Sequence, residues 1–314
     1  MLKQAAICLL LFTAKVFAQN NNIPRDTSFT IYSTLIKEQK KRPFIKVASP
    51  EKPADVLIKT DLIYKEINER KIPLDIYFPS AIKKLKPAVL LVFGGGWRSG
   101  DKSQNSAMSI EMAKNGYVAV SPEYRLSLEA PYPAAVYDLK AAIRWMRANA
   151  KTYGIDTNKI AILGCSAGGE LAAFVGTTNG DLHFEDAVGN PNHSAKVQAV
   201  VDIDGILAFH HPESAEGVIA GQWLGGSYAE KPQIWEEAAP LNHVNNQTPP
   251  FLFLNSSTPR FHAGRTDLIH KLDSLHIYSE IHEFPDTPHP YWFFHPWFSP
   301  MMEFMVAFLN KEFK

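Results

Sequence analysis

The sequence predicts an α/β fold built on a doubly wound, mostly parallel sheet. Two observations predict it. Short apolar runs alternate with helix-favouring segments over roughly 250 residues, as in sheets whose helices cover both faces. Several of these runs, such as residues 88–93, are continuously apolar. A strand that is covered on both faces buries all its side chains, so it shows no alternation of polarity.

The strands can be assigned in chain order. Residues 61–67 and 72–77 alternate in polarity and predict an antiparallel pair joined by a turn at residues 68–70. Six further strands are predicted at residues 88–93, 117–120, 160–163, 197–203, 251–254 and 278–284. The parallel part of the sheet therefore starts after an antiparallel hairpin.

The remaining segments set the domain organisation. Residues 134–153 carry apolar side chains at helical spacing, which predicts a long helix. The polar and aromatic insertion at residues 206–244 predicts a helical cap. We expect a signal peptide at residues 1–18, an N-terminal arm at 19–55 and a catalytic domain at 56–314.

Composition and charge exclude some classes of partner. The chain has 314 residues, with 32 basic and 32 acidic side chains and 46% hydrophobic residues. A globular protein with balanced charge is not expected to bind nucleic acid, whose phosphates attract basic surfaces. Membrane insertion is not expected either. No residues cluster with the spacing of a zinc site, so we expect no metal or other cofactor.

The first residues resemble a secretory leader. Lys3 gives a positive start, and residues 5–12 form an apolar run that is too short to span a bilayer. Val16 and Ala18 place small side chains at the −3 and −1 positions of a cleavage site. This pattern predicts a periplasmic or secreted protein.

A serine follows the apolar run at residues 160–163. Residues 164–168 read GCSAG, which fits the G-x-S-x-G pattern of a sharp strand-to-helix turn. Such a turn exposes the serine hydroxyl, so Ser166 is the candidate nucleophile. The backbone amides at the start of the following helix can face a developing oxyanion.

A glycine-rich turn follows the strand predicted at residues 88–93. Residues 93–97 read FGGGW. Successive glycines let bare backbone approach a ligand, so their amides can point into a cleft. The backbone amides of this turn are therefore candidate oxyanion donors.

A histidine follows the last predicted strand. His289 lies where the chain order serine, acid, histidine places the general base. His295, six residues later, is the rival candidate. We expect His289 to take the serine proton and return it to the leaving alcohol.

These motifs, in this order, resemble the α/β-hydrolase superfamily. Within it, the chain is most similar to hormone-sensitive-lipase-like and feruloyl or acetylxylan esterase-like (BD-FAE-like) carbohydrate esterases, from about residue 61 onwards. The resemblance implies Ser166 as the nucleophile, His289 as the base, and the amides of Gly95, Gly96 and Ala167 as the oxyanion hole.

The acid departs from the pattern of these relatives, which place it in the turn after the penultimate strand. No carboxylate stands there in this chain. Asp204, after the preceding predicted strand, is the preferred candidate. Asp267, Glu283 and Asp286 are the alternatives. The imidazole needs one of them to hold its tautomer and to stabilise the imidazolium.

Basic and aromatic residues suggest how substrate could bind. Arg260, His262 and Arg265 lie where the acid turn faces the active site. Arginine suits planar carboxylates, such as the uronic acid of pectin. Trp97 and Trp223 are candidates for stacking on a sugar ring.

We therefore expect a secreted serine esterase that removes acetyl or methyl esters from plant cell-wall polysaccharides such as pectin or xylan. Its partner would be a polysaccharide or oligosaccharide ester, hydrolysed through an acyl-enzyme on Ser166. Two alternatives remain: a serine peptidase of the prolyl-oligopeptidase type, and a hydrolase-like carbohydrate-binding protein without activity.

Overall fold

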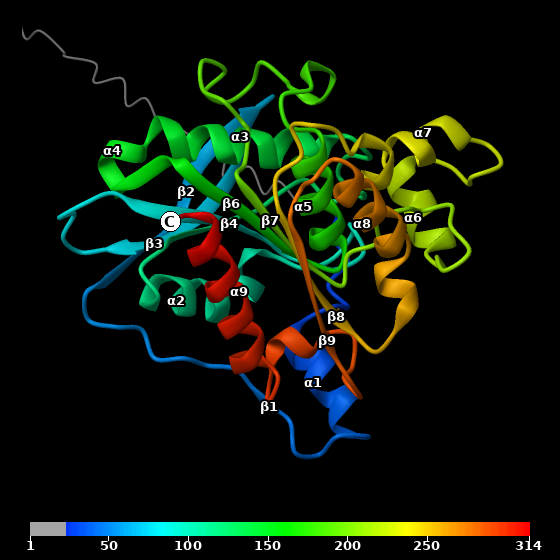
Figure 1. Cartoon of the computed structure of the whole chain (residues 1–314), viewed down its shortest axis with the longest axis horizontal. Coiled ribbons are helices and arrows are strands. Elements are labelled where there is room, and N and C mark those ends of the chain that lie inside the picture. Colours follow the sequence, from blue (N-terminus) through cyan, green and yellow to red (C-terminus); the bar gives the residue numbers. More distant parts are fainter. Residues whose placement is uncertain (1–22) are drawn as a thin grey trace, which may run out of the picture.

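A computed structural model describes residues 23–314 (Figure 1). The predicted signal peptide at residues 1–18 lies outside the described residues, as do residues 19–22 of the predicted arm.

Eight strands form the central sheet, in the spatial order β2-β3-β5-β4-β6-β7-β8-β9. Their bounds are β2 Val56–Ile67, β3 Arg70–Pro79, β4 Lys86–Val92, β5 Val118–Pro122, β6 Ile155–Cys165, β7 Ala199–Ile203, β8 Phe251–Ser256 and β9 Ser279–Phe284. The β2–β3 and β3–β5 pairs are antiparallel, and every pair from β5 to β9 is parallel. The mostly parallel sheet predicted from the sequence is confirmed.

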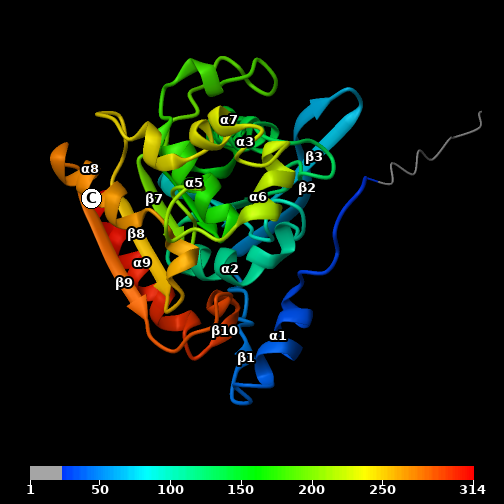
Figure 2. The same cartoon turned by 90° about the vertical axis from the view of Figure 1, so that its right-hand side faces the viewer.

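Helices cover both faces of this sheet (Figures 1 and 2). The α-helices are α1 Ile31–Gln39, α2 Ser106–Lys114, α3 Ala134–Ala148, α4 Ala150–Tyr153, α5 Ala167–Thr177, α6 Gly217–Leu224, α7 Pro232–Glu237, α8 Arg265–Ser274 and α9 Phe298–Glu312. Short 3₁₀ turns are η1 Lys102–Asn105, η2 Leu182–Phe184, η3 Pro240–His243, η4 Pro259–His262 and η5 Tyr291–Phe293. The predicted helix at residues 134–153 is divided at Asn149 into α3 and α4.

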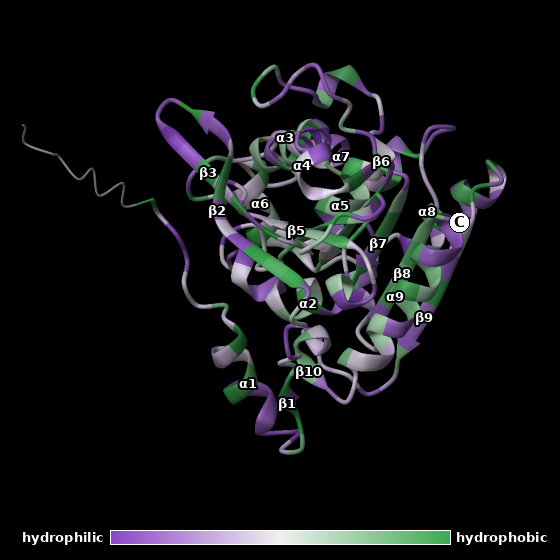
Figure 3. Ribbon diagram, turned by 90° about the vertical axis from the view of Figure 1, so that its left-hand side faces the viewer, coloured by the Kyte–Doolittle hydropathy of each residue, from purple (hydrophilic) through white to green (hydrophobic). Residues whose placement is uncertain are grey.

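The hydrophobic core has two layers because the central strands bury side chains on both faces. On one face, α3 and α5 pack against alternate residues such as Leu90 and Ile162. On the other, α2 and α9 pack against Val89 and Leu163. Figure 3 shows the apolar central strands in green and the hydrophilic outer tip of the β2–β3 hairpin in purple.

Two appendages border one end of the sheet. The insertion at residues 206–244 carries α6 and α7, as expected for a helical cap. The N-terminal arm contains α1, whose first turn is closed by reciprocal hydrogen bonds between Thr30 and Ser33. It continues into β1 Lys46–Val47, which pairs antiparallel with β10 Phe294–His295. The arm therefore lies beside the segment that follows His289 (Figure 2).

Within residues 23–314, no helix combines the length and the apolar character needed to cross a membrane.

Candidate active site

Ser166 lies at a strained turn between β6 and α5. Its backbone has φ 55° and ψ −124°, a conformation that costs free energy outside glycine. The flanking glycines are required sterically: a Cβ at Gly164 would lie 1.8 Å from the carbonyl oxygen of Gly168, and one at Gly168 would lie 2.3 Å from that of Val92. The turn thereby holds the serine hydroxyl at the carboxyl end of the sheet.

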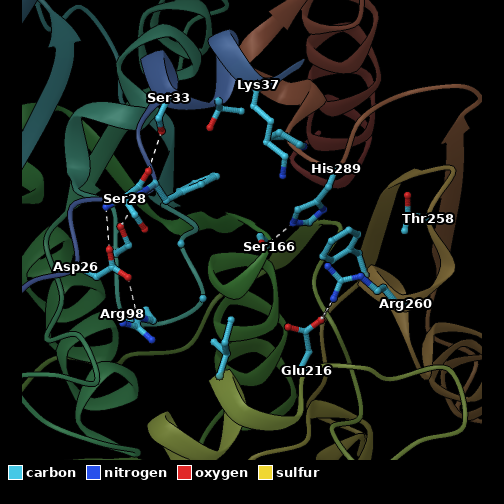
Figure 4. Close-up of a pocket in the computed structure, with 18 of the residues that line it drawn as sticks. Asp26, Ser28, Ser33, Lys37, Arg98, Ser166, Glu216, Thr258, Arg260 and His289 are labelled. Atoms are coloured by element: carbon cyan, nitrogen blue, oxygen red, sulfur yellow. Dashed lines mark hydrogen bonds and ion pairs between the residues drawn. The ribbon is translucent and has the colours of Figure 1, made fainter. Parts of the chain in front are cut away.

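Ser166, His289 and Asp204 form a continuous hydrogen-bonded chain. His289 Nε2 lies 2.8 Å from Ser166 Oγ, and His289 Nδ1 lies 2.9 Å from Asp204 Oδ2 (Figure 4 shows the first contact). The Asp204 side chain is buried, and its Oδ1 accepts a hydrogen bond of 2.7 Å from the Ser256 amide. The structure thus brings together the three residues proposed for catalysis.

The other candidate acids contact different partners. Asp267 lies 3.1 Å from Nε2 of His211, and Glu283 forms an ion pair of 2.9 Å with Arg265. Asp286 uses its carbonyl to accept a hydrogen bond from Arg42.

The rival base also lies apart from the serine. His295 belongs to β10, where it pairs with Lys46, and its ring packs against Phe298. Its position in a strand leaves His289 as the imidazole that faces Ser166.

The proposed oxyanion donors line the same pockets as Ser166. Gly95 and Gly96 have φ values of 135° and 60°, and both line the same cavity as Ser166. Among the described residues, neither of their amides has a hydrogen-bond acceptor. Ala167 is the first residue of α5, so its amide has no acceptor within the helix. All three amides are available to a ligand.

A cavity of about 1030 Å³ opens over Ser166 and His289 (Figure 4). The FGGGW turn, the cap and the η4 segment contribute to its walls. The N-terminal arm contributes the residues Asp26, Ser28, Phe29, Ser33, Thr34, Lys37 and Glu38. No role of this arm is predictable from the sequence, because nothing local in it shows which loop it packs against.

The predicted basic cluster is divided by the structure. Arg260 lines the cavity, pairs with Glu216 at 2.9 Å and lies over the ring of Phe261. His262 is buried, and its pKa is lowered by burial and by the neighbouring Arg265. Neither His262 nor Arg265 is among the residues that line the cavity.

That division corrects the prediction that all three basic residues bind substrate. Arg265 is held by Glu283 and by Asn255, which accepts a hydrogen bond of 2.7 Å. These contacts hold the Arg265 guanidinium against β8 and β9. Of the three basic residues, only Arg260 therefore lines the cavity.

The prediction that Trp97 and Trp223 stack on a sugar is wrong. Trp97 is only 2% exposed and Trp223 is fully buried. Their rings stack on each other at 5.0 Å between centroids, and Trp97 Nε1 donates a hydrogen bond to Glu170. Because α6 packs its tryptophan against the FGGGW turn, neither ring has a face left for substrate.

Phe261 is a further site residue, which was not predicted from the sequence. Its ring lies parallel to the His289 imidazole, at 3.4 Å between centroids and 11° between planes. Trp292 meets the same imidazole edge-on at 5.1 Å. These two rings hold the imidazole plane, and no motif in the sequence marks either of them.

Two buried acids lie beneath the serine turn. Burial raises the pKa of Glu170 and of Asp202 well above the ordinary range of carboxyl groups. Glu170 Oε1 and Asp202 Oδ2 have no hydrogen-bond partner among the described residues. Burial therefore disfavours the ionised form of both carboxyl groups.

Comparison with known proteins bears on the family of this chain. The profile of the BD-FAE family matches residues 74–260. The chain belongs to the BD-FAE family. The resemblance stated from the motifs is confirmed, and the family match spans the oxyanion turn, Ser166, Asp204 and the cap.

Several relatives of this BD-FAE chain are named as esterases. Esterase LipC of Mycobacterium tuberculosis is 33% identical over 180 residues, which are 55% of this chain and 44% of LipC. An arylesterase of Saccharolobus solfataricus is 35% identical over 147 residues, or 46% of either chain. The chain thus spans less than half the length of these relatives.

Solved structures establish the α/β-hydrolase fold over most of the chain. A truncated carbohydrate esterase from gut microbiota superimposes with a TM-score of 0.69 at 26% identity, covering 85% of this chain and 99% of its own. A bifunctional GH43-CE protein of Bacteroides eggerthii gives 0.71 at 26% identity, covering 84% and 39%. Both are similar to this chain in fold.

Proposed function

We propose that this protein is a serine carboxylic-ester hydrolase that removes small ester groups from plant-type polysaccharides. The observation that carries the proposal is the chain of hydrogen bonds from Ser166 through His289 to Asp204, open to a cavity of about 1030 Å³. The esterase names of the relatives support the same reaction class.

The geometry supports the following mechanism. His289 Nε2 accepts the proton of Ser166 as the serine oxygen attacks the ester carbonyl. The amides of Gly95, Gly96 and Ala167 donate hydrogen bonds to the resulting oxyanion. The imidazolium then gives its proton to the leaving alcohol, and an acyl-enzyme remains. Water, activated by His289, attacks that acyl group and releases the acid and free Ser166.

The carboxylate of Asp204 keeps a proton on Nδ1 of His289, so that Nε2 is free to accept the serine proton. Because Asp204 is buried and its other oxygen is held by the Ser256 amide, it stays in place through the cycle. These contacts support Asp204 as the triad acid.

The polysaccharide part of the proposal rests on the structural neighbours and on the size of the cavity. The neighbours include a carbohydrate esterase and a protein joined to a GH43 unit. A cavity of this volume accommodates a sugar beside the ester. Acetyl esters and methyl esters both fit the mechanism, because they differ only in whether the sugar lies on the alcohol or the acyl side.

We also propose that the protein is exported, on the strength of the leader-like pattern at residues 1–18. N-terminal sequencing of the protein recovered from the periplasm and the medium tests this point. Cleavage after Ala18 is expected, and an intact leader in the cytoplasmic fraction would contradict it.

One experiment tests the activity directly. Acetylated xylan, acetylated pectin and methyl-esterified pectin are incubated with wild type, Ser166→Ala and Ser274→Ala, and released acetate and methanol are measured separately. Ser274, at the end of α8, is a matched control whose hydroxyl donates only to the Lys271 carbonyl. Wild type and Ser274→Ala should release either acetate or methanol. Ser166→Ala should release neither.

The same experiment separates the alternatives. Hydrolysis by Ser166→Ala would overturn the mechanism. Binding of oligosaccharide without release of acetate or methanol would favour a carbohydrate-binding protein, and turnover of peptidyl-proline substrates would favour a peptidase.

A further inference from the structure

The charged residues that line the active-site cavity are nearly all paired with one another. Arg98 pairs with Asp26 at 2.9 Å, and Arg260 pairs with Glu216 at the same distance. Glu38 lines the cavity as well, but its carboxylate is held by Arg42 at 3.1 Å. In each pair the positive and negative charges compensate each other, so these pairs add no net charge to the cavity wall.

Lys37 is the exception. It lies on the exposed face of α1 and lines the cavity, and within residues 23–314 its ammonium has no carboxylate within ion-pair distance. Figure 4 shows its side chain pointing from α1 towards His289 and the centre of the cavity. The cavity therefore presents one uncompensated positive charge close to the reacting groups.

The arm holds this lysine in a defined place. At the start of the arm, the Phe29 amide donates a hydrogen bond of 3.2 Å to Ser99 Oγ, beside the oxyanion turn. At its end, Arg42 donates to the carbonyl of Asp286, and β1 pairs with β10 after His289. Helix α1 is thus attached to the oxyanion loop and to the loop that carries His289. These contacts fix its position relative to the catalytic residues.

We propose that Lys37 binds a carboxylate of the substrate next to the scissile ester, so that the preferred substrate is an ester of an acidic sugar of the uronate class. This inference rests on the proposed esterase function and names its substrate class. It assigns recognition of the substrate carboxylate to Lys37 instead of to the basic cluster at residues 260–265. Arg260 is neutralised by Glu216, Arg265 by Glu283, and His262 is buried with a lowered pKa.

The position of Lys37 makes it a determinant of this chain rather than of the whole family. The BD-FAE profile starts at residue 74, after the entire arm. The catalytic residues come from the matched domain and the segment after it, whereas the lysine comes from a separate N-terminal element. An ammonium on a flexible stem suits a carboxylate that different sugar chains present at slightly different positions.

The test compares two acetylated oligosaccharides of equal length, one of galacturonate and one of xylose. For each, kcat/KM is measured with wild type, Lys37→Met, Lys37→Arg and Lys40→Met. Methionine keeps the apolar stem and removes the charge. Lys40, also exposed and at the end of α1, does not line the cavity and is the matched control.

Wild type should prefer the acidic substrate. Lys37→Met should lower the acidic-to-neutral ratio about fivefold, as expected for loss of one partly exposed ion pair, mainly through KM. Lys37→Arg and Lys40→Met should keep the ratio. Added salt should weaken the preference of wild type and have little effect on that of Lys37→Met, because it screens the same charge.

The inference would be overturned by an acidic-to-neutral ratio that Lys37→Met leaves unchanged, or by a fall of equal size in Lys40→Met. Wild-type hydrolysis of both sugars at equal rates would also overturn it while leaving the esterase function intact. Hydrolysis of neither acetylated oligosaccharide would instead count against acetyl-ester hydrolysis as the proposed activity.

Discussion

The carboxylate of Asp204 lies 2.9 Å from Nδ1 of His289, although 85 positions separate the two residues in the chain. Asp204 directly follows β7, and His289 follows β9, while β8 lies between these two strands. Parallel strands end at the same edge of a sheet, so the loops after β7 and β9 can meet there. The acid can therefore come from β7 instead of β8 without moving the histidine.

Replacing the proposed acid tests this relationship. Asp204→Asn should keep the fold, because the amide oxygen of asparagine can still accept the hydrogen bond from the Ser256 amide. Turnover should fall by about 10⁴-fold, since asparagine no longer holds the productive tautomer of His289. Steady-state kinetics with a chromogenic acetyl ester measure the loss, and circular dichroism checks the fold.

Asp267→Asn is the matched control for that change, because Asp267 is half exposed and contacts His211 instead. It should keep close to wild-type turnover. A large loss in Asp267→Asn together with a small loss in Asp204→Asn would reverse the assignment.

Removing the ring beside the base should slow the reaction. Phe261→Leu takes away the flat surface on which His289 rests at 3.4 Å. A mispositioned imidazole should lower kcat/KM by about 10- to 100-fold. Phe261→Tyr keeps the ring and should stay close to wild type. Equal losses in the two variants would show that the stacked ring does not position the base.

The glycine before the serine should not tolerate a side chain. A Cβ at Gly164 would lie 1.8 Å from the carbonyl oxygen of Gly168, so Gly164→Ala should lower the free energy of unfolding by more than about 4 kcal/mol. Gly225→Ala is the control, because its φ of 78° is strained but its Cβ would meet no atom within 4 Å. It should cost about 1–2 kcal/mol. Urea denaturation measures both, and similar losses would contradict the steric argument.

The buried acid Glu170 should make stability depend on pH. Burial raises its pKa in the folded state, whereas the unfolded chain has the ordinary pKa of about 4.3. The folded state therefore favours the protonated carboxyl of Glu170. The resulting stabilisation is complete below pH about 4 and is lost as the pH rises towards the folded-state pKa.

Glu170→Gln cannot ionise and keeps an oxygen that can accept the hydrogen bond from Trp97 Nε1. It should be more stable than wild type at neutral pH, and the difference should shrink as the pH approaches about 4. Denaturation series at several pH values measure this difference. A variant that is less stable than wild type at neutral pH would show that Glu170 is ionised in the fold.

Much of the fold was predictable because its causes are local. The central strands bury side chains on both faces, so continuous apolar runs mark them. The glycines around Ser166 are demanded by contacts within a few residues, and this is why a short pattern identifies the turn. His289 was predictable from its place after the last strand.

The wrong predictions of substrate-binding residues share one cause. The exposure of a side chain depends on the tertiary structure and not on its neighbours in the sequence. Trp97 and Trp223 looked available to a sugar, but each covers the other once α6 packs on the FGGGW turn. Arg265 looked like part of a binding cluster, but Glu283 of the neighbouring strand holds it.

The sequence by itself determined the strands, the strained serine turn, the glycine-rich turn and the position of the base. Steric clashes and side-chain periodicity act over a few residues and leave their mark in the order of amino acids. Only the tertiary structure shows which of the four candidate acids contacts His289, because that contact depends on which strand ends lie close together in the sheet. It also brought α1 and Lys37 to the cavity, since that placement depends on contacts with loops far away in the chain.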